Sequence, residues 1–364
     1  MPPTSTLFSS DYALARRKFL AACTLAGLEA TEYLHPLRGP AGEVLATDVV
    51  RIGPADASRL LVLTSGIHGV ELFAGSGCQI DWLLQASVAR LPPDTAVVLV
   101  HAINPWGASW LRRYTEDNID LCRNFVDYAR MPALPRAPAY APLHASVTVD
   151  PSDAAAVAAA DQRLSIFERD NGQQALYTAL MGGQYDLPDG MGFGGTAPTW
   201  SRRTIEQILQ QHGAAARHVC LVDYHTGLGP YGYGSMVALQ QGEALARMRL
   251  AFGGRVEAVF ENGAPENFAP VYGHSTPGYE RALPHAVVTA GVLEFGTGRP
   301  QHMLELLLRD QREWAAGRGR EQPSSVRLEL RDFFYPGQAD WQRGLVDRSR
   351  LIIDQALAFI ASST

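Results

Sequence analysis

Two histidines and two glutamates of this 364-residue chain follow apolar runs at three separate places. His68 and Glu71 lie in SGIHGVELFAG, His225 follows HVCLVDY, and Glu294 follows AGVL. Zinc accepts imidazole nitrogen and carboxylate oxygen, and a set of three protein ligands leaves one position open for water or substrate. A further carboxylate beside such an ion can act as a general base. Two imidazoles with one carboxylate therefore predict a zinc site, and Glu294 is free for proton transfer.

Buried strands are expected to position these residues. Apolar runs predict strands at residues 45–53, 59–66, 95–104, 218–227 and 282–298. Segments with helical period predict helices at 75–91, 153–171, near 201–212 and at 349–361. This order indicates βαβ connections. Open α/β sheets bind ligands at the carboxyl ends of their strands, so we expect the four side chains at one edge of the sheet.

Three motifs carry a family resemblance: His68-Gly69-Val70-Glu71, Asp223-Tyr224-His225-Thr226-Gly227 and Leu293-Glu294-Phe295-Gly296. In type and order they resemble the zinc carboxypeptidase superfamily, which includes carboxypeptidase A-like enzymes, succinylglutamate desuccinylases and aspartoacylases. The similarity spans roughly residues 60 to 300 and is nearest to a bacterial, peptidase-like branch. It implies one zinc ion held by His68, Glu71 and His225, with Glu294 as general base and acid. The implied fold is α/β, with a mixed, mostly parallel central sheet sandwiched between helices.

A second signature of the superfamily binds the carboxylate of the substrate. Here it resembles Arg112-Arg113-Tyr114 followed by Asp120-Leu121-Cys122-Arg123-Asn124-Phe125. A guanidinium offers two parallel donors to a carboxylate, which suits this role. By resemblance Arg123 binds the free carboxylate and Arg113 polarises the scissile carbonyl, with Arg112 as the alternative to Arg113.

One residue departs from that signature. Relatives usually carry asparagine where this chain has Cys122, and a thiol is a much weaker hydrogen-bond donor than an amide. Carboxylate recognition is then altered, or Asn124 substitutes for the missing amide. A nucleophilic Cys122 is a lesser alternative, because the sequence places no base beside it.

Candidates for supporting roles lie near the last two motifs. The superfamily uses a mobile tyrosine upstream of the glutamate, and the loop VYGHSTPGY supplies Tyr272 and Tyr279. Asp223 is expected to hold His225 through its second ring nitrogen, as carboxylates often do for metal-binding histidines. His274 lies in the same loop and is expected to be structural.

Composition limits the partners of the protein. The formal charge of −6 and a pI near 5.9 argue against nucleic acid, and no basic run indicates a membrane surface. The four cysteines are dispersed without CxxC spacing, so neither a disulfide framework nor a thiolate zinc site is predicted. A peptide or acyl amino acid with a free carboxylate is the expected partner. The sequence indicates no oligomeric state.

The N-terminal region allows two interpretations. Arg16-Arg17-Lys18-Phe19-Leu20 resembles a twin-arginine export motif, but the apolar run after it is short. We favour an amphipathic helix capped by Ser9, Ser10 or Asp11. Its apolar face would hold Tyr12, Ala15, Phe19, Ala22 and Cys23. A cytoplasmic location is expected, with export as the alternative.

These observations predict one catalytic domain over residues 1–364, with an insertion at 127–200 that is rich in turn-forming residues. The leading hypothesis is a zinc-dependent, carboxypeptidase-like hydrolase of an amide bond next to a free carboxylate. An N-acyl amino acid amidohydrolase uses the same site and stays open. A zinc-retaining binding protein is suggested by Cys122, although Glu294 would be dispensable there. An exported cell-wall peptide hydrolase would require the twin-arginine interpretation.

Overall fold

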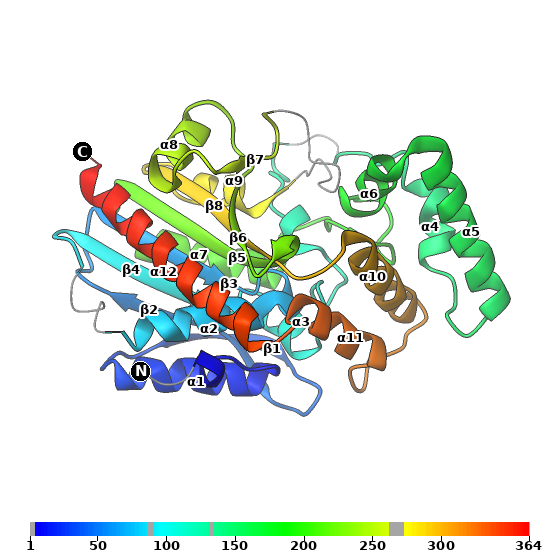
Figure 1. The fold of residues 1–364 in the computed structure, drawn as a ribbon, viewed down its shortest axis with the longest axis horizontal. Coiled ribbons are helices and arrows are strands. Elements are labelled where there is room, and N and C mark those ends of the chain that lie inside the picture. Colours follow the sequence, from blue (N-terminus) through cyan, green and yellow to red (C-terminus); the bar gives the residue numbers. More distant parts are fainter. Residues whose placement is uncertain (1–3, 86–90, 131–133, 262–272, 364) are drawn as a thin grey trace.

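The computed structural model describes residues 4–85, 91–130, 134–261 and 273–363, and a mixed sheet lies at its centre (Figure 1). The strand order is β1-β2-β4-β3-β5-β8-β6-β7. β4, β3, β5 and β8 pair in parallel, as do β6 and β7, while β1–β2, β2–β4 and β6–β8 are antiparallel. The predicted mixed, mostly parallel sheet is therefore confirmed. The strands are β1 Thr31–Arg38, β2 Val44–Ile52, β3 Arg59–Ser65, β4 Thr95–His101, β5 His218–Tyr231, β6 Gly234–Ala238, β7 Glu257–Ala258 and β8 Val287–Gly296.

The central strands are apolar because both of their faces are buried. In β3, Leu61 and Leu63 belong to one apolar core, whereas Leu60 and Val62 belong to the core on the opposite face. Successive side chains of a strand point to opposite faces, so a doubly covered strand becomes a continuous apolar run. Burial on both faces therefore explains why these segments are recognisable as strands in the sequence.

Helices cover both faces of the sheet. α1 Tyr12–Leu25, α2 Leu72–Leu83, α8 Gly242–Phe252 and α12 Ala339–Ser362 pack on the first core, and α7 Trp200–His212 and α9 Ser275–Ala282 on the second. The predicted first helix is confirmed. Asp11 caps it by accepting the Leu14 backbone N–H at 2.8 Å, and its buried residues are Tyr12, Ala15, Phe19, Ala22 and Cys23.

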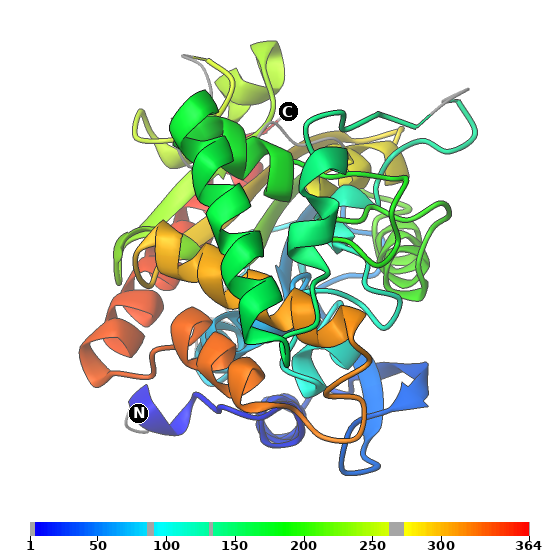
Figure 2. The same cartoon turned by 90° about the vertical axis from the view of Figure 1, so that its right-hand side faces the viewer.

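A third apolar core lies beside one end of the sheet, where the helices in front in Figure 2 gather. It joins helices of the 134–198 segment to two helices from the C-terminal third of the chain. The segment contributes η5 Ala141–Leu143, α4 His144–Val147, α5 Ala154–Asn171 and α6 Gln173–Met181, and the later part contributes α10 Pro300–Ala315 and α11 Ser325–Phe334. The short elements η1 Thr4–Thr6, η2 Gly69–Glu71, α3 Pro105–Ser109 and η4 Leu121–Arg123 complete the described structure.

Several predicted boundaries are wrong. The helix expected at 75–91 begins at Leu72 and ends at Leu83, and the last helix begins at Ala339 rather than at 349. β1, β6, β7, α3, α4, α6, α8, α10 and α11 were not predicted. The loop expected around Tyr279 is also wrong, because Ser275–Ala282 form the helix α9. β1 is an edge strand with a mostly exposed, polar sequence, which gives no apolar run to detect.

The twin-arginine-like motif lies inside α1. Arg16 donates from Nε to Asp48 Oδ2 at 2.8 Å and from its terminal nitrogen to Asp48 Oδ1 at 3.0 Å, which fastens α1 to β2. Among the described helices, none is both long enough and apolar enough to cross a membrane.

Candidate metal centre and active site

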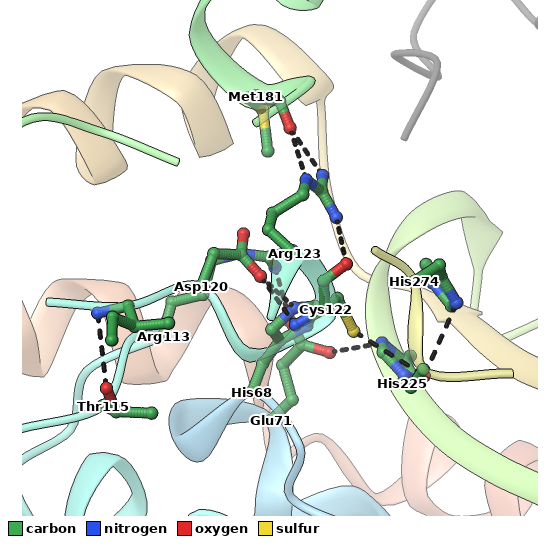
Figure 3. Close-up of polar contacts among 12 residues, drawn as sticks. His68, Glu71, Arg113, Thr115, Asp120, Cys122, Arg123, Met181, His225 and His274 are labelled. Atoms are coloured by element: carbon green, nitrogen blue, oxygen red, sulfur yellow. Dashed lines mark hydrogen bonds and ion pairs between the residues drawn. The ribbon is translucent and has the colours of Figure 1, made fainter. Parts of the chain in front are cut away.

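A cavity of about 70 Å³ lies where β3, β5 and β8 end, and most of the polar residues singled out in the sequence line it (Figure 3). Its polar lining contains two histidines predicted as ligands, a third histidine, two glutamates and two arginines. The lining residues are His68, Glu71, Arg113, Cys122, Arg123, Met181, His225, Thr226, Leu228, Val237, His274, Val292, Glu294 and Met303.

The turn that carries His68 and Glu71 packs directly on the arginine loop. β3 ends at Ser65, and η2 brings Glu71 back toward the cavity. Gly69 allows this contact, because a Cβ atom there would lie 2.1 Å from the carbonyl carbon of Gly107. The backbone N–H groups of Gly69 and Val70 donate to the carbonyls of Arg113 and Arg112, at 3.2 and 2.9 Å.

Both imidazoles are buried and carry a ring nitrogen without a hydrogen-bond partner. His68 Nε2 lies 3.3 Å from Asp120 Oδ1, whereas its Nδ1 lies 2.9 Å from Glu71 Oε1 without the alignment of a hydrogen bond. His225 Nε2 lies 3.3 Å from Asp223 Oδ2, again without that alignment. The other ring nitrogen of His225, Nδ1, lies 3.4 Å from Glu71 Oε2, so the Nδ1 atoms of both imidazoles face Glu71. A cation bound beside Glu71 would fit these two nitrogens, with Asp120 and Asp223 on the opposite ring nitrogens.

Glu71 lies between the two imidazoles and stays ionised. Its Oε1 accepts from Arg113 at 2.8 Å, and its Oε2 accepts the Thr226 backbone N–H at 3.1 Å and lies 3.4 Å from His225 Nδ1. Burial alone would raise the pKa of Glu71, but the adjacent imidazoles and Arg113 hold that pKa well below its ordinary value. An anionic carboxylate beside two imidazoles is a donor set that fits zinc.

Glu294 enters the cavity from β8. It is the register partner of His225 on β5, and its Oε1 accepts the Leu228 backbone N–H at 2.9 Å. Burial, reinforced by the negative charge of Glu71, raises the pKa of Glu294 to about 7. A carboxyl group with that pKa can both accept and donate a proton near neutrality, as a general base and acid must.

Cys122 faces the imidazoles from η4. Asp120 caps this turn by accepting the Cys122 backbone N–H at 3.0 Å, and the thiol comes within 4.8 Å of a ring nitrogen of both His68 and His225. Burial would raise the pKa of the Cys122 thiol, but His68 and His274 hold that pKa well below its ordinary value. Cysteine spacing in the sequence indicated no thiolate metal site, whereas the fold places the Cys122 sulfur beside two imidazoles that could share an ion with it.

Arg112 and Arg113, the two candidates for the arginine that polarises the carbonyl, point to different places. Arg113 lines the cavity and contacts Glu71, with its Nε 3.5 Å from Asp120 Oδ2. Arg112 points away from the cavity, because its fully buried guanidinium is bound to Asp310 at 2.8 Å and stacks on Trp314. The alternative assignment of Arg112 to the substrate is therefore corrected.

Arg123 also lines the cavity. Its Nε donates to the Met181 carbonyl at 3.1 Å, and a terminal nitrogen donates to the Cys122 carbonyl at 3.2 Å. Among the described residues, its hydrogen bonds go to backbone carbonyls rather than to a carboxylate. Burial would raise the pKa of Asp120, but the charges of Arg123 and Arg113 hold that pKa well below its ordinary value, so Arg123 has a carboxylate neighbour at the cavity.

The remaining candidates lie away from the cavity or outside the description. The amide of Asn124 donates to the carbonyls of Gly194 and Ala197, at 2.8 and 3.0 Å, so it cannot substitute for an amide at Cys122. Tyr279 is buried and donates to Asp223 Oδ2 at 3.3 Å, without lining the cavity. Tyr272 lies outside the described residues.

Sequence reasoning missed two side chains of the site. The sequence assigns Asp120 only to the arginine signature, whereas its Oδ1 lies 3.3 Å from His68 Nε2. Its position just before Leu121-Cys122 is typical of an aspartate that caps a helical turn, which is a signal that could have found it. His274 was expected to be structural but lines the cavity beside Cys122. It caps α9 by accepting the Thr276 backbone N–H, and nothing in its local sequence indicates the cavity.

No curated protein sequence matches the chain. One similar solved structure is that of bovine thrombin-activatable fibrinolysis inhibitor in complex with tick carboxypeptidase inhibitor, with 9% identity, a TM-score of 0.47 and 97% of each chain covered. Another is carboxypeptidase A from Helicoverpa armigera, with 10% identity and a TM-score of 0.46 over 100% of this chain and 77% of that chain. Succinylglutamate desuccinylase from Chromobacterium violaceum is similar at 15% identity and a TM-score of 0.38, over 85% of this chain and 73% of that chain.

At these identities and TM-scores the likenesses indicate nothing about the activity of the chain. What the chain does is therefore inferred from its own residues. A family model matches residues 8–348, nearly the whole chain. The chain belongs to the family described as "Protein of unknown function (DUF2817)".

Proposed function

We propose that the protein is a zinc-dependent hydrolase that cleaves an amide bond next to a free carboxylate. The observation that carries this proposal is the meeting of Glu294 with two buried imidazoles, each with its Nδ1 facing Glu71, in one cavity. Two arginines line the same cavity, so a base, a cation site and anion-binding groups lie together. Such convergence of perturbed titratable groups in a pocket is typical of an active site.

One zinc ion per chain would be held by His68, Glu71 and His225. When bound, zinc makes water ionise near neutral pH and polarises a carbonyl group. Asp120 and Asp223 orient the two imidazoles, since each lies 3.3 Å from the second ring nitrogen of one of them.

The proton is handled by Glu294. With a pKa of about 7, its carboxylate accepts a proton from the attacking water, and the resulting acid donates that proton to the leaving nitrogen. Arg113 lies close enough to Glu71 to face the carbonyl under attack, and Arg123 binds the substrate carboxylate. Fixing both ends of the substrate positions the amide bond between them.

The size of the cavity favours the second candidate, an N-acyl amino acid amidohydrolase. The cavity measures about 70 Å³, and Met181 at the end of α6 and Met303 on α10 form part of its wall. These side chains come from the layer beside the sheet, which restricts the space available for a long peptide. A compact acyl amino acid needs less room and presents the same carboxylate.

The metal is tested by measuring zinc in the purified protein. We expect about one zinc per wild-type chain and little zinc in His225→Ala, because that change removes one of three ligands. His302→Ala serves as a control, since His302 is an exposed histidine on α10. Equal zinc in wild type and His225→Ala would contradict the assigned ligand set, and a zinc-free wild type would contradict the proposed function.

Carboxylate recognition is tested with Arg123→Ala. Losing a charge-assisted hydrogen bond costs about 1.5–3 kcal/mol, so we expect kcat/KM for free acids to fall on the order of tenfold to a hundredfold. Peptides with free carboxyl ends, their amides and N-acyl amino acids are compared on wild type, Arg123→Ala and the exposed control Arg130→Ala. If amides are cleaved as fast as acids and Arg123→Ala changes nothing, Arg123 does not bind the substrate carboxylate. Faster cleavage of acyl amino acids than of peptides would favour the amidohydrolase.

A further inference from the structure

We infer that the thiolate of Cys122 is a direct ligand of the ion held by His68 and His225. The inference rests on the metal site of the proposed function and places sulfur there, in place of the Glu71 carboxylate, as the anionic ligand, so that three protein ligands still leave one position open for water. The superfamily signature that the sequence resembles carries asparagine at this position, so a sulfur ligand is not part of what the resemblance implies.

Geometry is the first support. One donor atom from each of His68, Cys122 and His225 lies within 4.8 Å of the other two, and all three residues are buried. Zinc binds nitrogen at about 2.0–2.1 Å and sulfur at about 2.3 Å, so the ligands of one ion lie less than about 4 Å apart. A small movement of these side chains toward a common centre completes the set. Figure 3 shows the sulfur of Cys122 directed toward His225.

The partners of the neighbouring donors are the second support. His68 Nδ1 and His225 Nδ1 lie 2.9 and 3.4 Å from the two oxygens of Glu71, so both rings face the same part of the cavity. Glu71 also receives Arg113 on one oxygen and the Thr226 backbone N–H on the other. The sulfur of Cys122 lies 3.9 Å from Ser275 Oγ and also interacts with the rings of His68 and His274. Unlike Glu71, the thiolate has imidazoles of the cavity as neighbours and no hydrogen bond from an arginine among the described residues.

A fixed backbone is the third support. Asp120 accepts the Cys122 N–H and lies 3.3 Å from His68 Nε2, so one carboxylate positions both a proposed sulfur ligand and a nitrogen ligand. A sulfur donor makes the site softer, which favours ions such as zinc over magnesium or calcium.

The test uses the full-length protein loaded with cobalt(II). The wild type is expected to show a near-ultraviolet thiolate-to-cobalt charge-transfer band that Cys122→Ala lacks. Cys78→Ala is the matched control, because Cys78 is also buried but lies on α2, with its sulfur near the Leu345 carbonyl. The Cys78→Ala protein should keep the band. Zinc affinity should fall at least tenfold in Cys122→Ala, since losing even an outer partner of a ligand typically costs about 10–100-fold.

Identical spectra for wild type and Cys122→Ala would overturn the inference. Cys122→Asn is the second variant if alanine prevents folding, and it too should bind cobalt without the band. Alkylation followed by peptide mass mapping gives an independent readout on the wild type. Cys122 should be protected in the zinc-loaded protein and react after the zinc is removed, whereas a nucleophilic Cys122 paired with His274 would react in both.

These outcomes separate the inference from the proposed function. A wild type that binds cobalt without the band refutes the sulfur ligand and leaves the hydrolase proposal standing. A band without hydrolysis of any amide substrate supports the sulfur ligand and refutes the hydrolase. A wild type that binds neither zinc nor cobalt refutes both.

Discussion

Glu294→Gln is expected to lower kcat for amide hydrolysis by about 10²–10⁴-fold while zinc stays bound. Glutamine keeps the size of the side chain, and its carbonyl oxygen can still accept the Leu228 backbone N–H. It cannot take up a proton, so only the proton transfer is removed. kcat and zinc content are measured on the same preparation.

Glu305→Gln is the matched control, because Glu305 is an exposed carboxylate on α10, outside the cavity lining. Its turnover should equal that of the wild type. Turnover near the wild-type value in Glu294→Gln would assign the proton transfer to another group. A zinc-loaded wild type that cleaves no amide at all would favour the binding protein that retains its metal.

Asp310→Ala should lower the free energy of unfolding by about 3–5 kcal/mol, the usual cost of breaking a buried ion pair from one side. Asp310 binds Arg112 at 2.8 Å and Arg327 at 3.0 Å, and both guanidinium groups are fully buried. Without the carboxylate, two positive charges would remain inside the protein. Urea unfolding of both forms measures the difference.

Glu329→Ala provides the comparison. Its pair with Arg309 is about half exposed, and such surface pairs contribute about 0–1 kcal/mol. A loss in Asp310→Ala no larger than that in Glu329→Ala would show that the buried cluster adds little stability. Because the Arg112 carbonyl accepts the Val70 N–H, the loosened cluster also lies one hydrogen bond from the metal-binding turn.

The parts of the fold that could be predicted from the sequence are those with an unambiguous burial pattern. β3, β5 and β8 are buried on both faces and appear as apolar runs, and α1 buries one regular stripe. Since β5 and β8 are parallel neighbours, residues at equivalent distances from their starts meet, which brings His225 beside Glu294. The strand pattern predicted that the two residues share one edge of the sheet, whereas the pairing of β5 with β8 and its register are seen only in the structure.

The parts that could not be predicted depend on contacts between distant segments. Arg112 and Arg113 are adjacent, and only the folded loop shows that one faces Asp310 and the other Glu71. Cys122 and His274 come from different loops, and neither has a local pattern that indicates a shared cavity. Hydrophobic periodicity describes which face is buried but not which polar groups meet there.

The hydrogen bonds from the 120–124 turn to the 134–198 segment have a consequence for protein engineering. Arg123 is bound to the Met181 carbonyl, and Asn124 to the carbonyls of Gly194 and Ala197, whereas His225 and Glu294 are carried by the sheet. The same turn carries Asp120, which lies 3.3 Å from His68 Nε2, and Cys122, which lies beside both imidazoles. Redesign of the 134–198 segment is therefore expected to alter the proposed carboxylate site and the proposed metal site together.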